Sequence, residues 1–128
     1  MTAPRPDSLA EVARRTLGGA VFRMELADFL DEFYLCPTAQ ALAEEPVILA
    51  GSVDRGHRKD VYLGATAEHL GRRFQFGLAP WVYDPRRYLD KPSFAMKTRE
   101  GRIFLLKDSP AAFKSRNLFV TGNVLSRV

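Results

Sequence analysis

Three side chains in this sequence have obvious reactive chemistry: one cysteine, Cys36, and two histidines, His57 and His69. A thiol beside an imidazole makes a nucleophilic pair, but Cys36 lies between Leu35 and Pro37 at the end of an apolar stretch. A free cysteine in such a setting usually packs as a small hydrophobic side chain. We therefore expect Cys36 to be structural. A single cysteine also excludes an internal disulfide and a cysteine-based zinc site.

The spacing of the two histidines argues against a metal site. His57 and His69 are twelve residues apart, and no H-x-x-x-H or H-E-x-x-H motif is present. Two histidines without further ligands in a spaced motif are a weak metal signal. We expect His69 to be a half-buried or exposed helical residue, and we predict no bound metal or cofactor.

Sequence motifs for other catalytic sites are also absent. The chain has neither of the glycine-rich phosphate-binding motifs, G-x-x-x-x-G-K-[ST] and G-x-G-x-x-G, and it has no G-x-S-x-G nucleophile motif. Gly51-Ser52 resembles the opening of a nucleotidyltransferase site, but the paired aspartates that hold magnesium there do not follow. We therefore predict no catalytic residue set. A small toxin-like enzyme using His57, Asp84 and Arg86 is kept as a second alternative.

Basic residues give a stronger functional signal. Arg55, Arg58 and Lys59 fall in a predicted loop, and Arg72 and Arg73 lie towards the end of the following helix. Clustered cations of this kind bind phosphates, and neighbouring aromatic rings can stack on bases. A nucleic-acid-binding regulator that uses these five residues and the basic carboxyl half is our first alternative function.

Charge is distributed unevenly along the chain. Residues 24–54 contain seven acids and no lysine or arginine, whereas residues 86–128 contain ten bases and three acids. Such asymmetry indicates a partner chosen by charge, unless the two regions face each other in the fold and cancel. Our leading prediction is a non-enzymatic interaction module that binds a protein partner. The candidate partner-binding residues are an acidic group and an aromatic and arginine-rich group: Asp28, Asp31 and Glu32, with Trp81, Tyr83, Asp84, Arg86, Arg87 and Tyr88.

Helices must position these side chains. Apolar residues recur at helical spacing in 22–33 and again in 60–74, and Asp7 or Ser8 can cap a helix that Gly18-Gly19 ends. Shorter helices are expected in 37–44, 86–90 and 111–116, with a polar loop at 51–59 and an extended segment at 117–120. Residues 47–50 and 102–107 suit either a strand or a helix. The fold class predicted is all-α, a compact bundle of about five to seven helices with one small β element.

The length of 128 residues suits one helical domain over residues 1–128, with residues 1–6 as a disordered arm. No signal peptide or membrane-spanning stretch is apparent, so we expect a cytoplasmic protein that does not enter membranes. The sequence does not indicate an oligomeric state.

Three segments resemble a family of short bacterial helical proteins of unassigned activity. They are LADFLDEFYLCPTAQALAEE at 26–45, APWVYDPRRYLDKPSF at 79–94 and SPAAFKSRNLFVTGNVLSRV from 109, and together they span most of the chain. Members often have a second aromatic residue after the proline, where this chain has Ser93. The family is similar to the partner, antitoxin-like half of toxin–antitoxin gene pairs. The resemblance implies a helical interaction protein whose partner is encoded nearby, and it assigns no site residue.

Overall fold

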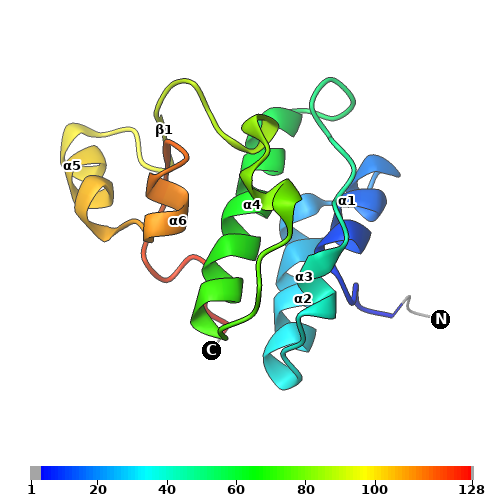
Figure 1. The fold of residues 1–128 in the computed structure, drawn as a ribbon. Coiled ribbons are helices and arrows are strands. Elements are labelled where there is room, and N and C mark those ends of the chain that lie inside the picture. The colour runs from blue at the N-terminus through cyan, green and yellow to red at the C-terminus, as the bar shows by residue number, and fades with distance from the viewer. Residues whose placement is uncertain (1–3, 128) are drawn as a thin grey trace.

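A computed structural model describes residues 4–127 of the chain (Figure 1). Over these residues the protein is mainly helical with one two-stranded sheet, which confirms the predicted all-α class with a small β element. The α-helices are α1 (Leu9–Leu17), α2 (Phe22–Leu35), α3 (Gln40–Ala43), α4 (Gly56–Arg73), α5 (Arg99–Asp108) and α6 (Ala111–Lys114). The 3-10 helices are η1 (Pro80–Tyr83) and η2 (Pro85–Arg87), and the strands are β1 (Ser93–Phe94) and β2 (Leu118–Phe119).

The amino-terminal helix begins and ends where the sequence predicts. The Ser8 hydroxyl accepts a hydrogen bond from the backbone N–H of Glu11 at 3.1 Å, which caps α1. Gly18 follows the last turn, and Gly19 adopts a φ of 110°, a conformation that favours glycine. Of the arm expected at 1–6, residues 1–3 lie outside the described part. Pro6 is buried, and Arg5 pairs with Glu32.

Helix α4 begins at Gly56, earlier than the start at residue 60 that the sequence predicts. The loop predicted at 51–59 therefore ends at Arg55. Arg55 turns the chain with a φ of 54°, and a Cβ on Gly56 would overlap the backbone carbonyl of Leu49. Glycine at this position therefore lets the preceding loop pack directly on the first turn of α4. Hydrophobic periodicity missed this turn because its side chains are polar or absent.

Residues 47–50 form neither a strand nor a helix. Leu49 is fully buried, and the Asp60 carboxylate accepts hydrogen bonds from the backbone N–H groups of Leu49 at 2.8 Å and Ala50 at 3.0 Å. A side chain thus supplies the partners that a neighbouring strand would otherwise provide.

The carboxyl half corrects several expected bounds. The IFLL run lies in α5, a ten-residue helix capped by the Thr98 hydroxyl, so the helical alternative for 102–107 is correct. The helices expected at 37–44 and 111–116 shrink to α3 and α6, and the one expected at 86–90 is the single 3-10 turn η2. The extended segment at 117–120 contains β2, which pairs in parallel with β1.

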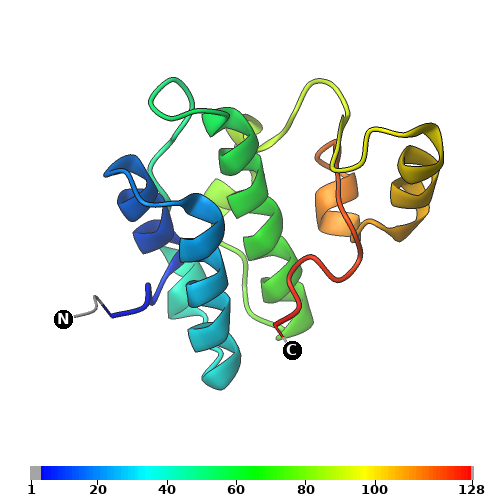
Figure 2. The same cartoon turned by 180° about the vertical axis from the view of Figure 1, so that it is seen from behind.

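The core brings α1, α2, α4 and α6 together around buried leucine, valine and phenylalanine side chains. Phe29 and Phe33 of α2 stack at 5.7 Å between ring centroids, as the predicted apolar face requires. Helix α5 lies at the opposite end of the molecule from α1 to α3 (Figures 1 and 2). Seen from behind, the carboxyl-terminal segment runs back to the end of α4, on the side of α4 where α2 lies (Figure 2).

Candidate functional site

Two of the predicted partner-binding residues lie in the interior. Trp81 is buried, its indole N–H donates to the backbone carbonyl of Ala43 at 3.2 Å, and the Arg87 guanidinium lies 5.0 Å from its ring centroid. Arg87 has no exposed side-chain surface. The prediction that Trp81 and Arg87 contact a partner is therefore corrected, since both side chains are part of the protein core.

Arg87 is buried with an acidic partner on α4. One of its terminal nitrogens lies 3.7 Å from the Asp60 carboxylate, and the other donates to the backbone carbonyl of Pro46 at 2.6 Å. Burial lowers the pKa of Arg87 from its ordinary value, while the carboxylates of Asp60 and Glu45 act against that effect. This ion pair joins η2, α4 and the 46–50 connector.

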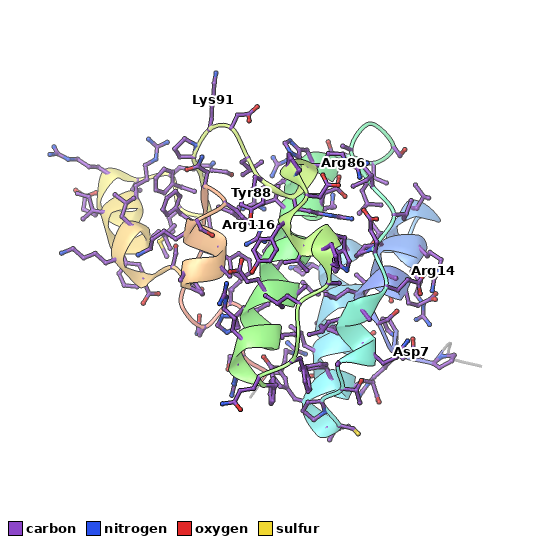
Figure 3. The ribbon with its side chains drawn as sticks, in the orientation of Figure 1. Asp7, Arg14, Arg86, Tyr88, Lys91 and Arg116 are labelled. Carbon is purple, nitrogen blue, oxygen red and sulfur yellow. The ribbon has the colours of Figure 1, made fainter. Side chains whose placement is uncertain are left out.

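A second buried arginine, Arg116, packs against α4 about two turns further along the helix, at Glu68. Arg116 pairs with Glu68, donates to the carbonyl of Val82 at 2.8 Å, and stacks on the Tyr88 ring at 4.6 Å (Figure 3). Burial alone would raise the pKa of Glu68, but hydrogen bonds from Arg116 and Arg72 outweigh it and hold the pKa below its ordinary value. Tyr88 is thus half-buried beneath an arginine.

The rest of the aromatic and arginine-rich group forms local contacts. Asp84 caps η2 through the backbone N–H of Arg86 and pairs with the Arg86 guanidinium at 2.7 Å, which lowers the Asp84 pKa to about 2. The exposed Tyr83 hydroxyl accepts a hydrogen bond from Arg72 at 3.0 Å. Asp84, Arg86 and Tyr83 remain on the surface, but they do not form one surface with Trp81 and Arg87.

The predicted acidic surface is largely neutralised within the chain. Asp31 pairs with Arg127 at 2.9 Å and Glu32 pairs with Arg5 at 3.2 Å. The hydrogen bond from Arg127 lowers the Asp31 pKa. Asp28 is exposed and makes no ion pair within residues 4–127. Acidic and basic regions thus meet on this side of the fold, which is the alternative that charge asymmetry left open.

The predicted nucleic-acid-binding residues divide between the two ends of α4. Arg72 pairs with Glu68 at 2.9 Å, and the Arg73 guanidinium lies over the Tyr34 and Phe74 rings. Arg55, Arg58 and Lys59 lie together at the amino-terminal end of α4. The structure therefore brings three of the five residues to one place.

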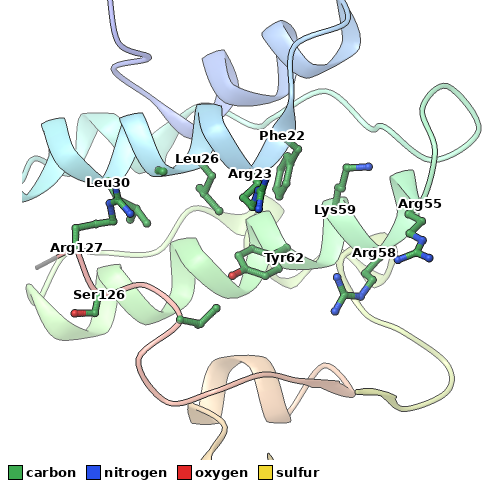
Figure 4. A pocket seen from close by; sticks show the side chains of 12 residues that line it. Phe22, Arg23, Leu26, Leu30, Arg55, Arg58, Lys59, Tyr62, Ser126 and Arg127 are labelled. Carbon is green, nitrogen blue, oxygen red and sulfur yellow. The ribbon is translucent and has the colours of Figure 1, made fainter. Parts of the chain in front are cut away.

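A pocket of about 430 Å³ opens beside these three cations, between α2 and α4 (Figure 4). Its apolar surface comes from α2, α4 and the carboxyl-terminal segment: Phe22, Leu26, Ala27, Leu30, Tyr62 and Val124. Its charged lining is entirely basic: Arg23, Arg55, Arg58, Lys59 and Arg127. We call this pocket the basic groove. Sequence reasoning missed Arg23 and Arg127 because neither lies near the other cations along the chain.

The cations of the basic groove have few partners in the fold. Among the described residues, Arg23, Arg55, Arg58 and Lys59 form no ion pair, and Arg127 pairs with Asp31 outside the lining. Arg58 donates to the Ser93 hydroxyl at 3.2 Å, and Lys59 donates to the backbone carbonyl of Asp54. Burial raises the pKa of Tyr62 in the groove wall to about 12, although the Arg58 charge opposes this effect. The groove is thus a positive surface above an apolar floor.

The histidines and the cysteine do not converge. His57 is exposed and its Nε2 lies 3.0 Å from the carbonyl of Tyr88, whereas His69 is twelve residues along α4, about 18 Å away at 1.5 Å per residue. His69 is half-buried, as expected, and burial together with Arg73 lowers its pKa. Cys36 is exposed at the end of α2, so the expectation that it packs in an apolar setting is wrong.

Within residues 4–127 no group of three or more histidine, cysteine, aspartate or glutamate side chains is placed to hold a metal ion. No helix in this part of the chain has both the length and the apolar character needed to span a membrane.

Comparisons with protein-family models, curated proteins and solved structures give no match to the chain. The resemblance to antitoxin-like bacterial proteins therefore stays a prediction.

Proposed function

We propose that this protein is a non-enzymatic interaction module that binds a negatively charged partner through the basic groove. The observation that carries the proposal is a lining of five cations and no carboxylate around an apolar floor, with four of the five forming no ion pair among the described residues. Unpaired surface charge of one sign attracts a partner of the other sign and speeds its association. Burial of the apolar floor against a partner adds a favourable hydrophobic contribution that charge alone does not provide.

The sign of this charge changes the partner that we expect. The acidic residues of α2 suggested a basic partner, yet Asp31 and Glu32 already pair with Arg127 and Arg5. Four cations that form no ion pair among the described residues, Arg23, Arg55, Arg58 and Lys59, line the groove instead. A masking, antitoxin-like role stays part of the proposal, with an acidic rather than a basic surface as the target.

Nucleic-acid binding is the second candidate. Its support is the cluster of Arg55, Arg58 and Lys59 at the first turn of α4, because phosphates bind well where several cations meet a helix amino terminus. Arg72 and Arg73, at the far end of α4, would take no part in such binding.

Affinity purification with matched charge variants tests the proposal. Tagged wild-type protein, an R55E/K59E groove variant and an R99E/K107E variant of α5 are recovered from the cells that produce the protein. Both variants lower the net charge equally, and Arg99 and Lys107 are exposed at the other end of the molecule. We expect a partner that the wild type and the α5 variant retain and the groove variant loses. Loss from both variants alike, or no retained macromolecule, would contradict the proposal.

A further inference from the structure

The shape of the basic groove carries information about its occupant. A second hollow of about 430 Å³ lies between the α1–α2 turn and residue 53, and it shares Phe22, Arg23 and Lys59 with the first. The two hollows are therefore neighbours across the first turns of α2 and α4. The basic groove itself runs between two helices, from Phe22 to Leu30 on α2 and from Arg55, at the N-cap of α4, to Tyr62. A groove of this shape suits a rod-like segment better than a compact small molecule.

The apolar floor follows a helical ridge. Phe22, Leu26 and Leu30 lie at i, i+4 and i+8 on α2 and line the groove in a row (Figure 4). Rows of this kind accept the i, i+3, i+4 and i+7 side chains of a partner helix, which packs ridge into groove. Leu26 and Leu30 are only 5% and 2% exposed, so most of the apolar surface open to a partner comes from the half-buried side chains of Phe22, Ala27, Tyr62 and Val124.

The aromatic rings of the groove are poorly placed to stack on nucleic-acid bases. Tyr62 makes edge-to-face contacts with Phe22 at 5.9 Å and with Phe113 at 5.0 Å, so its ring already has two aromatic neighbours. Sequence-tolerant binding of single strands relies on rings with free faces. The remaining floor is aliphatic, which favours leucine-like or phenylalanine-like side chains as the occupant.

Charges line the whole length of the groove. Arg55, Arg58 and Lys59 lie at one end, Arg23 lies beside the floor, and Arg127 lies at the other end beside Leu30 (Figure 4). A ligand with a single carboxylate would meet only one of these positions. A helix with acidic residues on both sides of its apolar stripe would meet the four cations that form no ion pair among the described residues, since Arg127 already pairs with Asp31.

We propose that the occupant is an acidic amphipathic α-helix of a partner protein, seated between α2 and α4 with its apolar stripe on the half-buried side chains of Phe22, Ala27 and Tyr62. This inference rests on the proposed function and names the kind of partner. The helix axis follows the groove, and aspartate or glutamate residues flanking the stripe contact the cations at its rim.

Selection from a display library of random 16-residue peptides tests this assignment without knowledge of the natural partner. The wild-type protein is the bait. Peptides that also bind an A27W variant, in which the larger side chain fills the groove without changing the charge, are discarded because they bind elsewhere. We expect an enriched pattern with apolar residues at i, i+3 or i+4, and i+7 and with acids between them. Enrichment of peptides without this pattern, or of none that depends on the groove, would overturn the assignment.

Fluorescence anisotropy on one enriched peptide completes the test. We expect A27W and R55E/K59E each to weaken binding at least tenfold, and a peptide of the same composition with a shuffled stripe to bind at least tenfold less tightly. A F104E variant serves as control, because Phe104 is about half exposed on α5 with Ile103 and Leu106. Equal binding of the shuffled peptide, or loss with F104E and not with A27W, would overturn the helix assignment.

Binding of a labelled 12-nucleotide single-stranded oligonucleotide is the last measurement of this test. Tighter binding of the oligonucleotide than of any enriched peptide, unaffected by A27W, would also overturn the helix assignment in favour of nucleic acid. In each of these cases groove-dependent capture in the affinity purification would leave the proposed function standing. Failure of that purification would contradict both the proposed function and the helix assignment.

Discussion

Asp60 and Arg87 lie 3.7 Å apart in the protein interior, and neither side chain has any exposed surface. The Asp60 carboxylate also accepts the backbone N–H groups of Leu49 and Ala50, while Arg87 donates to the carbonyl of Pro46. One buried ion pair therefore fixes the connector before α4 to the 3-10 turn η2 after it. Because this connector leads into Arg55 and the first turn of α4, the pair also helps to position one end of the basic groove.

Replacing Asp60 with alanine should destabilise the protein strongly. The change leaves the Arg87 charge buried without its partner and removes the acceptor for two backbone N–H groups, at a cost of about 3–5 kcal/mol. Urea denaturation followed by circular dichroism measures the change in unfolding free energy.

Asp31→Asn is the matched control for this ion pair. Asp31 pairs with Arg127 at 2.9 Å, closer than the 3.7 Å of the buried pair, but both side chains are partly exposed, so the loss should be about 1 kcal/mol or less. Equal effects of D60A and D31N would contradict the structural role that we assign to the buried pair.

Gly64 provides the space that the two buried arginines need. An added Cβ would lie 2.9 Å from the Arg87 Cβ and 3.4 Å from the Arg116 Nε, too close without a shift of the packing. Gly64→Ala should therefore cost about 1–3 kcal/mol despite the higher helix propensity of alanine. Gly77→Ala, where an added Cβ meets nothing within 4 Å, should change the unfolding free energy by less than about 1 kcal/mol. Thermal unfolding of both variants makes the comparison, and a stable G64A would show that the arginines are packed differently.

The protein should lose stability as the pH falls below about 6.5, the ordinary pKa of histidine. Burial and Arg73 lower the pKa of His69 in the fold, so the unfolded chain binds its proton first and unfolding becomes easier as the pH falls through the folded-state pKa. The lowered pKa of Glu68 acts only below its ordinary value of 4.5, so measurements between pH 7.5 and 5.5 isolate the histidine. Urea titrations of wild type and H69Q should show the decline only in the wild type. An equal decline in H69Q would assign it to another group.

The amphipathic helices could be predicted from sequence, but the buried ion pairs could not. Phe29 and Phe33 mark an apolar face at helical spacing, and Ser8 with Gly18 marks the ends of α1, because these signals are local in sequence. Arg87 gives no local sign of burial, since its partner Asp60 is 27 residues away. Charged residues are expected on the surface unless they are paired, and such pairing is a property of the fold.

The basic groove was only partly predictable for the same reason. Arg55, Arg58 and Lys59 are close in sequence and could be recognised as a cluster. Arg23 and Arg127 join them only because α2 and the carboxyl-terminal segment both pack near α4. The proximity of Asp31 to Arg127, which neutralises part of the predicted acidic surface, likewise depends on how the carboxyl-terminal segment packs.

Partner binding through the groove should depend on salt. Between 50 and 300 mM NaCl, we expect affinity for the captured partner to fall, because Arg55, Arg58 and Lys59 are partly or fully exposed and their fields are screened. R55E/K59E should reduce the slope of log Kd against log salt, whereas R99E/K107E should leave it unchanged. Calorimetric titration at four salt concentrations measures the slopes. A slope that the α5 variant alone reduces would place the interface on α5.

Site-specific photocrosslinking tests the central claim most directly. A photoreactive phenylalanine derivative replaces Ser126, an exposed residue in the lining of the basic groove, or, as a control, Leu35, which is highly exposed at the far end of α2 and lines neither hollow. After irradiation of the cells that produce the protein, we predict a discrete adduct with a macromolecule from position 126, reduced by R55E/K59E, and none from position 35. Adducts of equal yield from both positions, or an adduct from position 35 alone, would contradict partner binding in the groove.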